Sequence, residues 1–235
     1  MDFVDLHKQR FKKEDESFHD SVSQMLDMDI DKMDFIHHFP VFTGHVNLAR
    51  YLCLYECYKK VSHINGHYAD IGTWKGSSFL MIAKLMKLFE PHSYAQIHAF
   101  DWFQGMEKDV SGEGDKNYCT SYERLKKLVE IQDLDNIARI HKIDLTSELP
   151  KFFEPENGDS HVKYKYVFVD CGITEVLEPV MEHFWPRLAK GGIMIFDHYG
   201  MTGNPDENPV IDKYITEHEI QTMTFARQPT AFVIK

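Results

Sequence analysis

Four apolar stretches beyond residue 90 each end at an aspartate. They are Ala95–Phe100, Ala138–Ile143, Tyr164–Val169 and Ile193–Phe196, and the aspartates that follow are Asp101, Asp144, Asp170 and Asp197. Their apolar, β-branched and aromatic residues predict strands. Stretches with helical periodicity accompany them, at Ser77–Leu88, Ser121–Ile131 and Glu175–Leu188. Strands that alternate with helices predict an α/β fold, with a mostly parallel sheet covered by helices on both faces.

Three further strands complete the predicted sheet. His67–Ile71 is a short strand that enters a glycine turn, while Glu219–Phe225 and Ala231–Ile234 flank a turn and form an antiparallel C-terminal hairpin. The sequence thus predicts seven strands. The run Lys190-Gly191-Gly192 is expected to end the preceding helix, because glycine suits the left-handed cap.

The strand-end aspartates indicate a binding site. The carboxyl ends of parallel strands meet at one edge of a sheet, and ligands bind outside that edge near the point where the strand order reverses. A single aspartate there is also a common turn residue. Four of them at one edge are more informative than any one alone.

Bulk properties exclude several classes of protein. The net charge is −11, which disfavours a nucleic-acid or anionic-membrane partner. No stretch reaches membrane-spanning length, the first residues lack the apolar core of a signal peptide, and the four cysteines show no disulfide framework. These features predict a cytoplasmic protein. We expect two parts, a helical extension over residues 1–62 and a cofactor-binding domain over residues 63–235.

The turn Asp70-Ile-Gly72-Thr-Trp-Lys-Gly76 lies between a strand and a helix. Gly72 would let the backbone approach a ligand, and Gly76 would allow close helix–strand packing. Asp101, at the next strand end, suits the hydroxyls of a ribose. Asp70 suits a cationic amino group and would repel a pyrophosphate. This pattern favours S-adenosylmethionine (SAM) over a dinucleotide.

The sequence resembles the macrocin O-methyltransferase family, which includes the mycinamicin and novobiocin sugar O-methyltransferases. The resemblance lies in His67–Ser78, in Ala99–Gly105 and in Gly191–Gly200, where the family has an acid, G-x-W-x-G-G-S, then D-S-F-x-G-L. Here Ser77 replaces the second glycine of the pair, and Trp102 replaces the serine.

The resemblance implies the Rossmann-like fold of class I methyltransferases and SAM as cofactor. The residues it assigns to the cofactor are Asp70, Gly72, Thr73, Trp74, Gly76, Ser77, Ser78, Asp101, Trp102, Asp144 and Asp170. Asp144 would flank the adenine, and Trp74 would either shield the cofactor or simply pack. The acceptor would be a small hydroxylated molecule such as a sugar, recognised by the N-terminal helices and inserted loops. A homo-oligomer is also implied. From its own composition, with Gly112, Gly114 and several acids, the loop Glu107–Asn117 is either a lid that closes over the site or a plain solvated loop.

The resemblance also implies a divalent cation, Mg²⁺ or Mn²⁺, held by Asp170, Asp197 and His198. The family reads D-D-Y-G where this chain reads Asp197-His198-Tyr-Gly, and D-G-D where it reads Asp170-Cys-Gly. Magnesium prefers oxygen ligands, whereas imidazole suits other metals better. Three interpretations stay open: a different metal, a His198 that points away, or a metal-free site in which His198 is the base. The predicted catalytic residues are Asp170 and His198.

Two other functions remain in view. A nicotinamide-dependent oxidoreductase shares this sheet, but the chain lacks GxGxxG. A SAM-fold protein without catalysis is the other, because the second acids of the family are missing. Nicotinamide binding without SAM binding would support the first, and SAM binding without turnover the second.

Overall fold

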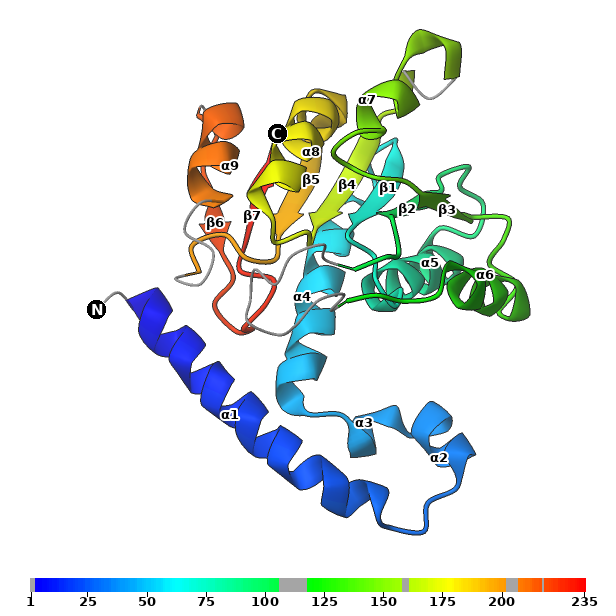
Figure 1. The fold of residues 1–235 in the computed structure, drawn as a ribbon, viewed down its shortest axis with the longest axis vertical. Coiled ribbons are helices and arrows are strands. Elements are labelled where there is room, and N and C mark those ends of the chain that lie inside the picture. Colours follow the sequence, from blue (N-terminus) through cyan, green and yellow to red (C-terminus); the bar gives the residue numbers. More distant parts are fainter. Residues whose placement is uncertain (1–2, 106–117, 158–160, 202–206, 217) are drawn as a thin grey trace.

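The structure is a computed structural model that describes residues 3–105, 118–157, 161–201, 207–216 and 218–235 (Figure 1). The predicted lid Glu107–Asn117 lies outside the described residues.

One mixed sheet organises the chain. Its strands are β1 (His67–Ile71), β2 (Ile97–Asp101), β3 (Ala138–Lys142), β4 (Tyr164–Val169), β5 (Leu188–Phe196), β6 (Gln221–Thr222) and β7 (Ala231–Ile234). The strand order is β3-β2-β1-β4-β5-β7-β6, with β1 to β5 parallel and β7 antiparallel to both neighbours. The predicted α/β class, with a seven-stranded, mostly parallel sheet and an antiparallel end, is confirmed.

Helices cover both faces of the sheet, and each face has its own apolar core. The first face carries α4 (His45–Val61), α5 (Ser77–Phe89) and α6 (Tyr122–Ile131). The second carries α7 (Leu149–Phe152), α8 (Thr174–Arg187) and α9 (Glu207–Ile215), with a short 3-10 helix, η1 (Pro155–Asn157), after α7. Side chains alternate across a strand, so Tyr166 and Phe168 of β4 enter the first core while Val167 and Val169 enter the second.

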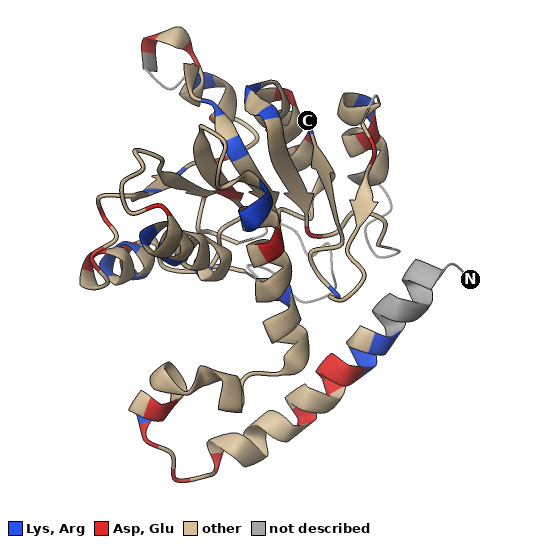
Figure 2. Ribbon diagram, turned by 180° about the vertical axis from the view of Figure 1, so that it is seen from behind, with Lys and Arg blue, Asp and Glu red and all other residues tan. Residues whose placement is uncertain are grey.

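The N-terminal helices lie largely outside these two layers. They are α1 (Phe3–Leu26), α2 (Lys32–His37) and α3 (Phe39–Phe42), and acidic and basic residues share α1 (Figure 2). Helix α4 differs, because Leu54, Cys57 and Val61 are fully buried against the sheet. The division at residues 62 and 63 stays a prediction. Among the described residues, none of the helices is long and apolar enough to cross a membrane.

Two boundary predictions were wrong. Gly191 and Gly192 do not end a helix but lie inside β5, which begins at Leu188, directly after α8. The backbone N–H of Gly191 donates to the carbonyl of Lys235 at 2.6 Å, and that of Lys235 donates to Gly192 at 3.0 Å. Pairing with the end of the chain therefore draws these glycines into the sheet. The predicted strand Glu219–Phe225 is reduced to Gln221–Thr222.

Candidate active site

The site lies at the carboxyl ends of β1 and β4, where the strand order reverses. Gly72 follows β1 with φ +79°, and its N–H donates to the carbonyl of Phe100 at 2.9 Å. A Cβ at Gly72 would lie 2.0 Å from the carbonyl oxygen of Asp170. The absence of a side chain at Gly72 thus allows the backbone that follows β4 to come close. A ligand could also approach the turn there.

The turn after Gly72 is held together from within. The Thr73 hydroxyl donates to the Asp70 carbonyl at 2.9 Å, and the Gly76 N–H donates to the Thr73 carbonyl at 2.8 Å. Gly76 has φ +87°, and a Cβ there would lie 2.4 Å from Cδ1 of Leu125. The expected close packing of Gly76 is therefore against helix α6, not against a strand.

The Asp70 carboxylate is buried beneath the turn, with 1% of the residue exposed. The Ser78 hydroxyl donates its one hydrogen bond between the two carboxylate oxygens, which lie 2.9 and 3.1 Å from it. Burial raises the pKa of Asp70 to about 7, although the hydrogen bond from Ser78 opposes this shift. In this arrangement Asp70 secures the first turn of α5. Its predicted contact with the amino group of SAM stays a prediction.

Asp101 joins the end of β2 to the glycine turn. One carboxylate oxygen accepts from the Trp74 N–H at 2.7 Å, and the other accepts from the Phe103 N–H at 2.6 Å. Burial raises the pKa of Asp101, while these two backbone hydrogen bonds oppose that shift. Each carboxylate oxygen has a second lone pair for a ligand hydroxyl. Trp102, the next residue, is half-buried.

Trp74 lies at the surface of the turn, with 36% of the residue exposed. Its ring packs edge-on against Tyr118 at 5.3 Å, and the Lys75 ammonium lies 4.1 Å from its centre. Next along the turn, the Ser77 hydroxyl is hydrogen-bonded to the hydroxyl of Tyr51 from α4. These contacts fit either role expected for Trp74.

Asp144 is separate from the other strand-end acids. Its carboxylate accepts from the Thr146 N–H at 2.9 Å and from the Ser147 hydroxyl at 2.7 Å. In return, the Glu148 carboxylate accepts from the Asp144 N–H at 2.8 Å. The contact from Thr146 is that of an Asx turn, so Asp144 is hydrogen-bonded within its own loop. Its predicted place beside the adenine stays a prediction.

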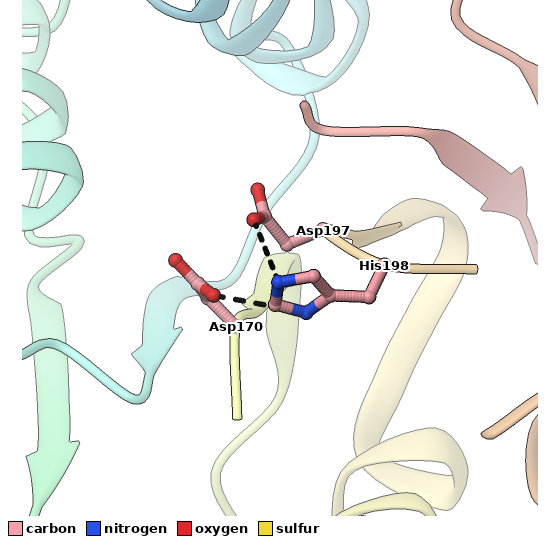
Figure 3. Close-up of side chains that lie close together, drawn as sticks. All are labelled: Asp170, Asp197 and His198. Carbon is pink, nitrogen blue, oxygen red and sulfur yellow. Dashed lines mark ion pairs between the residues drawn. The ribbon is translucent and has the colours of Figure 1, made fainter. Parts of the chain in front are cut away.

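Asp170, Asp197 and His198 come together as predicted (Figure 3). One potential ligand atom from each lies within 4.8 Å of the others. The Nε2 atom of His198 is 3.5 Å from Oδ2 of Asp197, and Nδ1 is 4.0 Å from Oδ1 of Asp170. Asp170 follows β4 and Asp197 follows the adjacent β5, so the strand pairing brings them together. Burial raises the pKa of Asp197, and the nearby Asp170 adds to this shift while Arg50 and His198 oppose it.

Arg50 is the residue of this cluster that sequence reasoning missed. Its Nη1 donates to Oδ1 of Asp197 at 2.5 Å, and its Nη2 donates to Oδ2 of Asp170 at 2.7 Å. Burial alone would lower the pKa of Arg50, but the two carboxylates outweigh it and raise the pKa. The guanidinium carbon also lies 5.3 Å from the centre of the Phe168 ring.

The sequence of helix α4 contains a pattern that could have indicated the role of Arg50. Arg50 shares its stripe with the buried residues Cys53, Leu54 and Cys57, which are three, four and seven positions further on. A charge on such a stripe needs an opposite charge nearby, because an unpaired buried charge is strongly destabilising. This pattern indicates a buried acidic partner but does not say which acid.

Comparison with known proteins places the chain among methyltransferases. A family model described as a methyltransferase domain matches residues 69–199. A structure of CalS11, described as a calicheamicin methyltransferase, superimposes with a TM-score of 0.76 and 18% identity, over 97% of this chain and 91% of that one. The apo structure of CalS11, described as a TDP-rhamnose 3'-O-methyltransferase, has a TM-score of 0.72 and 20% identity, over 97% and 92%.

A structure described as the O-methyltransferase NovP has a TM-score of 0.62 and 17% identity, over 80% of each chain. None of the curated proteins matches the sequence significantly. At these identities the structural likeness establishes the fold, and the family match covers more than half of the chain.

Proposed function

The chain belongs to the methyltransferase-domain family, and on this premise we propose that it is a SAM-dependent O-methyltransferase acting on a hydroxyl of a sugar or sugar-bearing metabolite. The observation that carries the proposal is the cluster of Asp170, Asp197 and His198 at the same sheet edge as the glycine turn. The description of CalS11 as a TDP-rhamnose 3'-O-methyltransferase supports the acceptor class, and that of NovP supports transfer to oxygen.

The cofactor would lie across the glycine turn. We assign its methionine end to the turn from Gly72 to Ser78, supported from below by Asp70, and its ribose to Asp101 with Trp102 beside it. Trp74 would border the cofactor, Asp144 the adenine, and Asp170 the transferred methyl. The remaining members of the turn are Thr73, Gly76 and Ser77.

The reaction needs a proton acceptor beside the acceptor hydroxyl. An oxygen lone pair of the hydroxyl attacks the methyl carbon as the bond from sulfur to that carbon breaks and its electrons return to sulfur. The hydroxyl proton passes to a ring nitrogen of His198, and the products are a methyl ether, neutral S-adenosylhomocysteine and imidazolium. His198 suits this role because a neutral imidazole has a ring nitrogen whose lone pair accepts a proton, and the side chain is partly accessible. Asp170 and Asp197, at 4.0 and 3.5 Å, would stabilise the charge it gains.

The divalent cation predicted from the resemblance fits this donor set poorly. Each carboxylate already accepts a hydrogen bond from Arg50, and the third ligand is an imidazole where magnesium prefers oxygen. A metal held by Asp170, Asp197 and His198 stays a prediction, and the mechanism above passes no step through it.

Turnover with defined acceptors tests the proposal. Purified protein, SAM and a panel of nucleotide sugars would be followed by release of S-adenosylhomocysteine and by mass spectrometry of the methylated product. We expect one sugar class to be methylated, and its deoxy analogue at that position to be inert. SAM binding without turnover on any hydroxylated acceptor would contradict catalysis, and nicotinamide binding without SAM binding would favour an oxidoreductase. Light scattering on the same sample checks the predicted homo-oligomer.

A further inference from the structure

We propose that Arg50 is a built-in cation that takes the place of a divalent metal between Asp170 and Asp197. The inference rests on the proposed function, because it concerns how this chain holds the carboxylates beside the acceptor hydroxyl. Arg50 is then a positioning residue: it acts through Asp170, Asp197 and, beyond them, His198.

The geometry divides the two carboxylates between two partners. Arg50 binds Oδ1 of Asp197 and Oδ2 of Asp170, and the other oxygen of each carboxylate faces the ring of His198. The planar guanidinium, with its several donors, bridges two separate carboxylates as a metal ion otherwise would. The carboxylates are therefore oriented without a metal.

The charges of the cluster are also partly balanced without a metal. Two carboxylates and one guanidinium leave a single negative charge on the cluster. A divalent ion bound by the same oxygens would instead lie close to the guanidinium and leave a net positive charge. Asp197 is almost fully buried, so this repulsion would be weakly screened. A second cation beside the guanidinium is therefore disfavoured.

The differences from the family sequence agree with a site in which Arg50 replaces the metal. The chain has Cys171-Gly172 and His198 where the resembling family has further acids, so it offers fewer oxygen ligands than that family. Helix α4 supplies the compensating charge from a buried stripe, and the next residue, Tyr51, binds Ser77 of the cofactor turn. One helix thus contacts both the carboxylates and the turn.

Manganese binding followed by the electron paramagnetic resonance of free Mn²⁺ tests the inference without using turnover. We expect titration of wild-type protein, with SAM present, to leave the free-Mn²⁺ signal unchanged, and chelator to leave activity unchanged. The variant Arg50→Met keeps much of the side-chain length but removes the positive charge. The negative charges of Asp170 and Asp197 are then no longer balanced. We expect it to deplete free Mn²⁺, to gain thermal stability from Mn²⁺, and to lose activity by roughly 10- to 100-fold.

Two further variants distinguish a positioning role of Arg50 from a purely structural one. Arg50→Lys keeps the charge but lacks the planar fork, so we expect a lower kcat, little change in KM for SAM and no binding of Mn²⁺. Arg10→Met removes an exposed arginine paired with Glu14 and should match the wild type in every assay.

Stoichiometric Mn²⁺ binding by the wild type, with activity lost in chelator and restored by Mn²⁺, would overturn the inference and leave the proposed function intact. If Arg50→Met does not fold, the Mn²⁺ titration of the wild-type protein still tests whether the cluster binds a metal. Absence of turnover in every sample would count against the proposed function alone, because the Mn²⁺ signal does not depend on it.

Discussion

His198 lies between two carboxylates, and the environment of this ring bears directly on the proposed chemistry. Its side chain is partly accessible, whereas Asp197 behind it is almost completely buried. In the proposed reaction, a ring in this position would meet the acceptor from its accessible side, with the carboxylates on the other. Removing it should affect proton transfer more than cofactor binding.

We therefore expect His198→Gln to lower kcat by roughly 10²- to 10⁴-fold, which is the usual contribution of a general base. Calorimetry should show SAM affinity close to that of the wild type. The matched control is His92→Gln, an exposed histidine between α5 and β2, which should retain full activity. A His198→Gln enzyme with normal kcat would exclude His198 as the base and point to Asp170.

Asp101 is expected to bind the cofactor and to hold the turn. Asp101→Asn loses the charge, and its amide nitrogen cannot accept from a backbone N–H, so one contact with Trp74 or Phe103 is broken. Hydrogen bonds to charged groups contribute about 1.5–3 kcal/mol, so we expect SAM to bind about tenfold more weakly or worse. Asp133→Asn, at an exposed carboxylate paired with Lys87, is the control. Unchanged SAM affinity in Asp101→Asn would exclude the ribose role.

At the scale of elements, the turn between β1 and α5 joins three parts of the molecule. Gly72 meets the backbone that follows β4, Asp101 binds the turn from the end of β2, and Gly76 meets Leu125 of α6. The two glycines differ in what surrounds them. Backbone cannot move aside easily, whereas the end of a leucine side chain can.

Alanine at either glycine should destabilise the fold, but to different extents. Both have positive φ, where alanine is strained, and overpacking adds typically about 1–3 kcal/mol. We expect the free energy of unfolding, measured with urea, to fall more for Gly72→Ala than for Gly76→Ala, because the first meets a carbonyl at 2.0 Å and the second a methyl at 2.4 Å. The opposite order would show that the turn relaxes away from Asp170.

At the scale of the whole molecule, the second core carries a property unrelated to the site. His98 of β2 and His141 of β3 share a hydrogen bond of 2.9 Å, and their rings stack at 5.2 Å. Burial lowers the pKa of His98 to about 3 and that of His141 to about 4, with neighbouring His141 and Arg139, respectively, adding to the shift. Both rings are therefore neutral in the folded protein near neutral pH.

This pair makes stability depend on pH. Unfolded histidine titrates near pH 6.5, so below that pH the unfolded chain binds protons that the folded chain does not. Their contribution to stability is complete above about pH 6.5 and is lost as the pH falls toward about 4. Urea unfolding at about pH 7.5 and about pH 5 should show a loss of about 2 kcal/mol or more from these rings.

The double variant His98→Phe/His141→Phe isolates this contribution, because other groups titrate in the same range. Its unfolding free energy should change less with pH than that of the wild type. Parallel pH curves for the two proteins would mean that the rings are protonated in the folded state or are not the source of the effect.

The sequence by itself determined the class of the fold and the sheet edge at which the candidate site lies. Strand and helix periodicity, the glycine turn and an aspartate at a strand end are local patterns, so they predicted the sheet and a shared edge for Asp170 and Asp197, while the family resemblance added His198 to them. Parallel pairing of β4 and β5 then follows from the α/β arrangement.

Only the tertiary structure decided what depends on distant partners. Gly191 and Gly192 lie in a strand because the far end of the chain pairs with them. Asp144 follows a strand like the others, but the residues after it bind its carboxylate locally. Arg50 joins the site because packing of α4 on the sheet carries it to two acids more than a hundred positions away. Sequence periodicity shows which face of a helix is buried, whereas the partner of a charge on that face depends on how the helix packs.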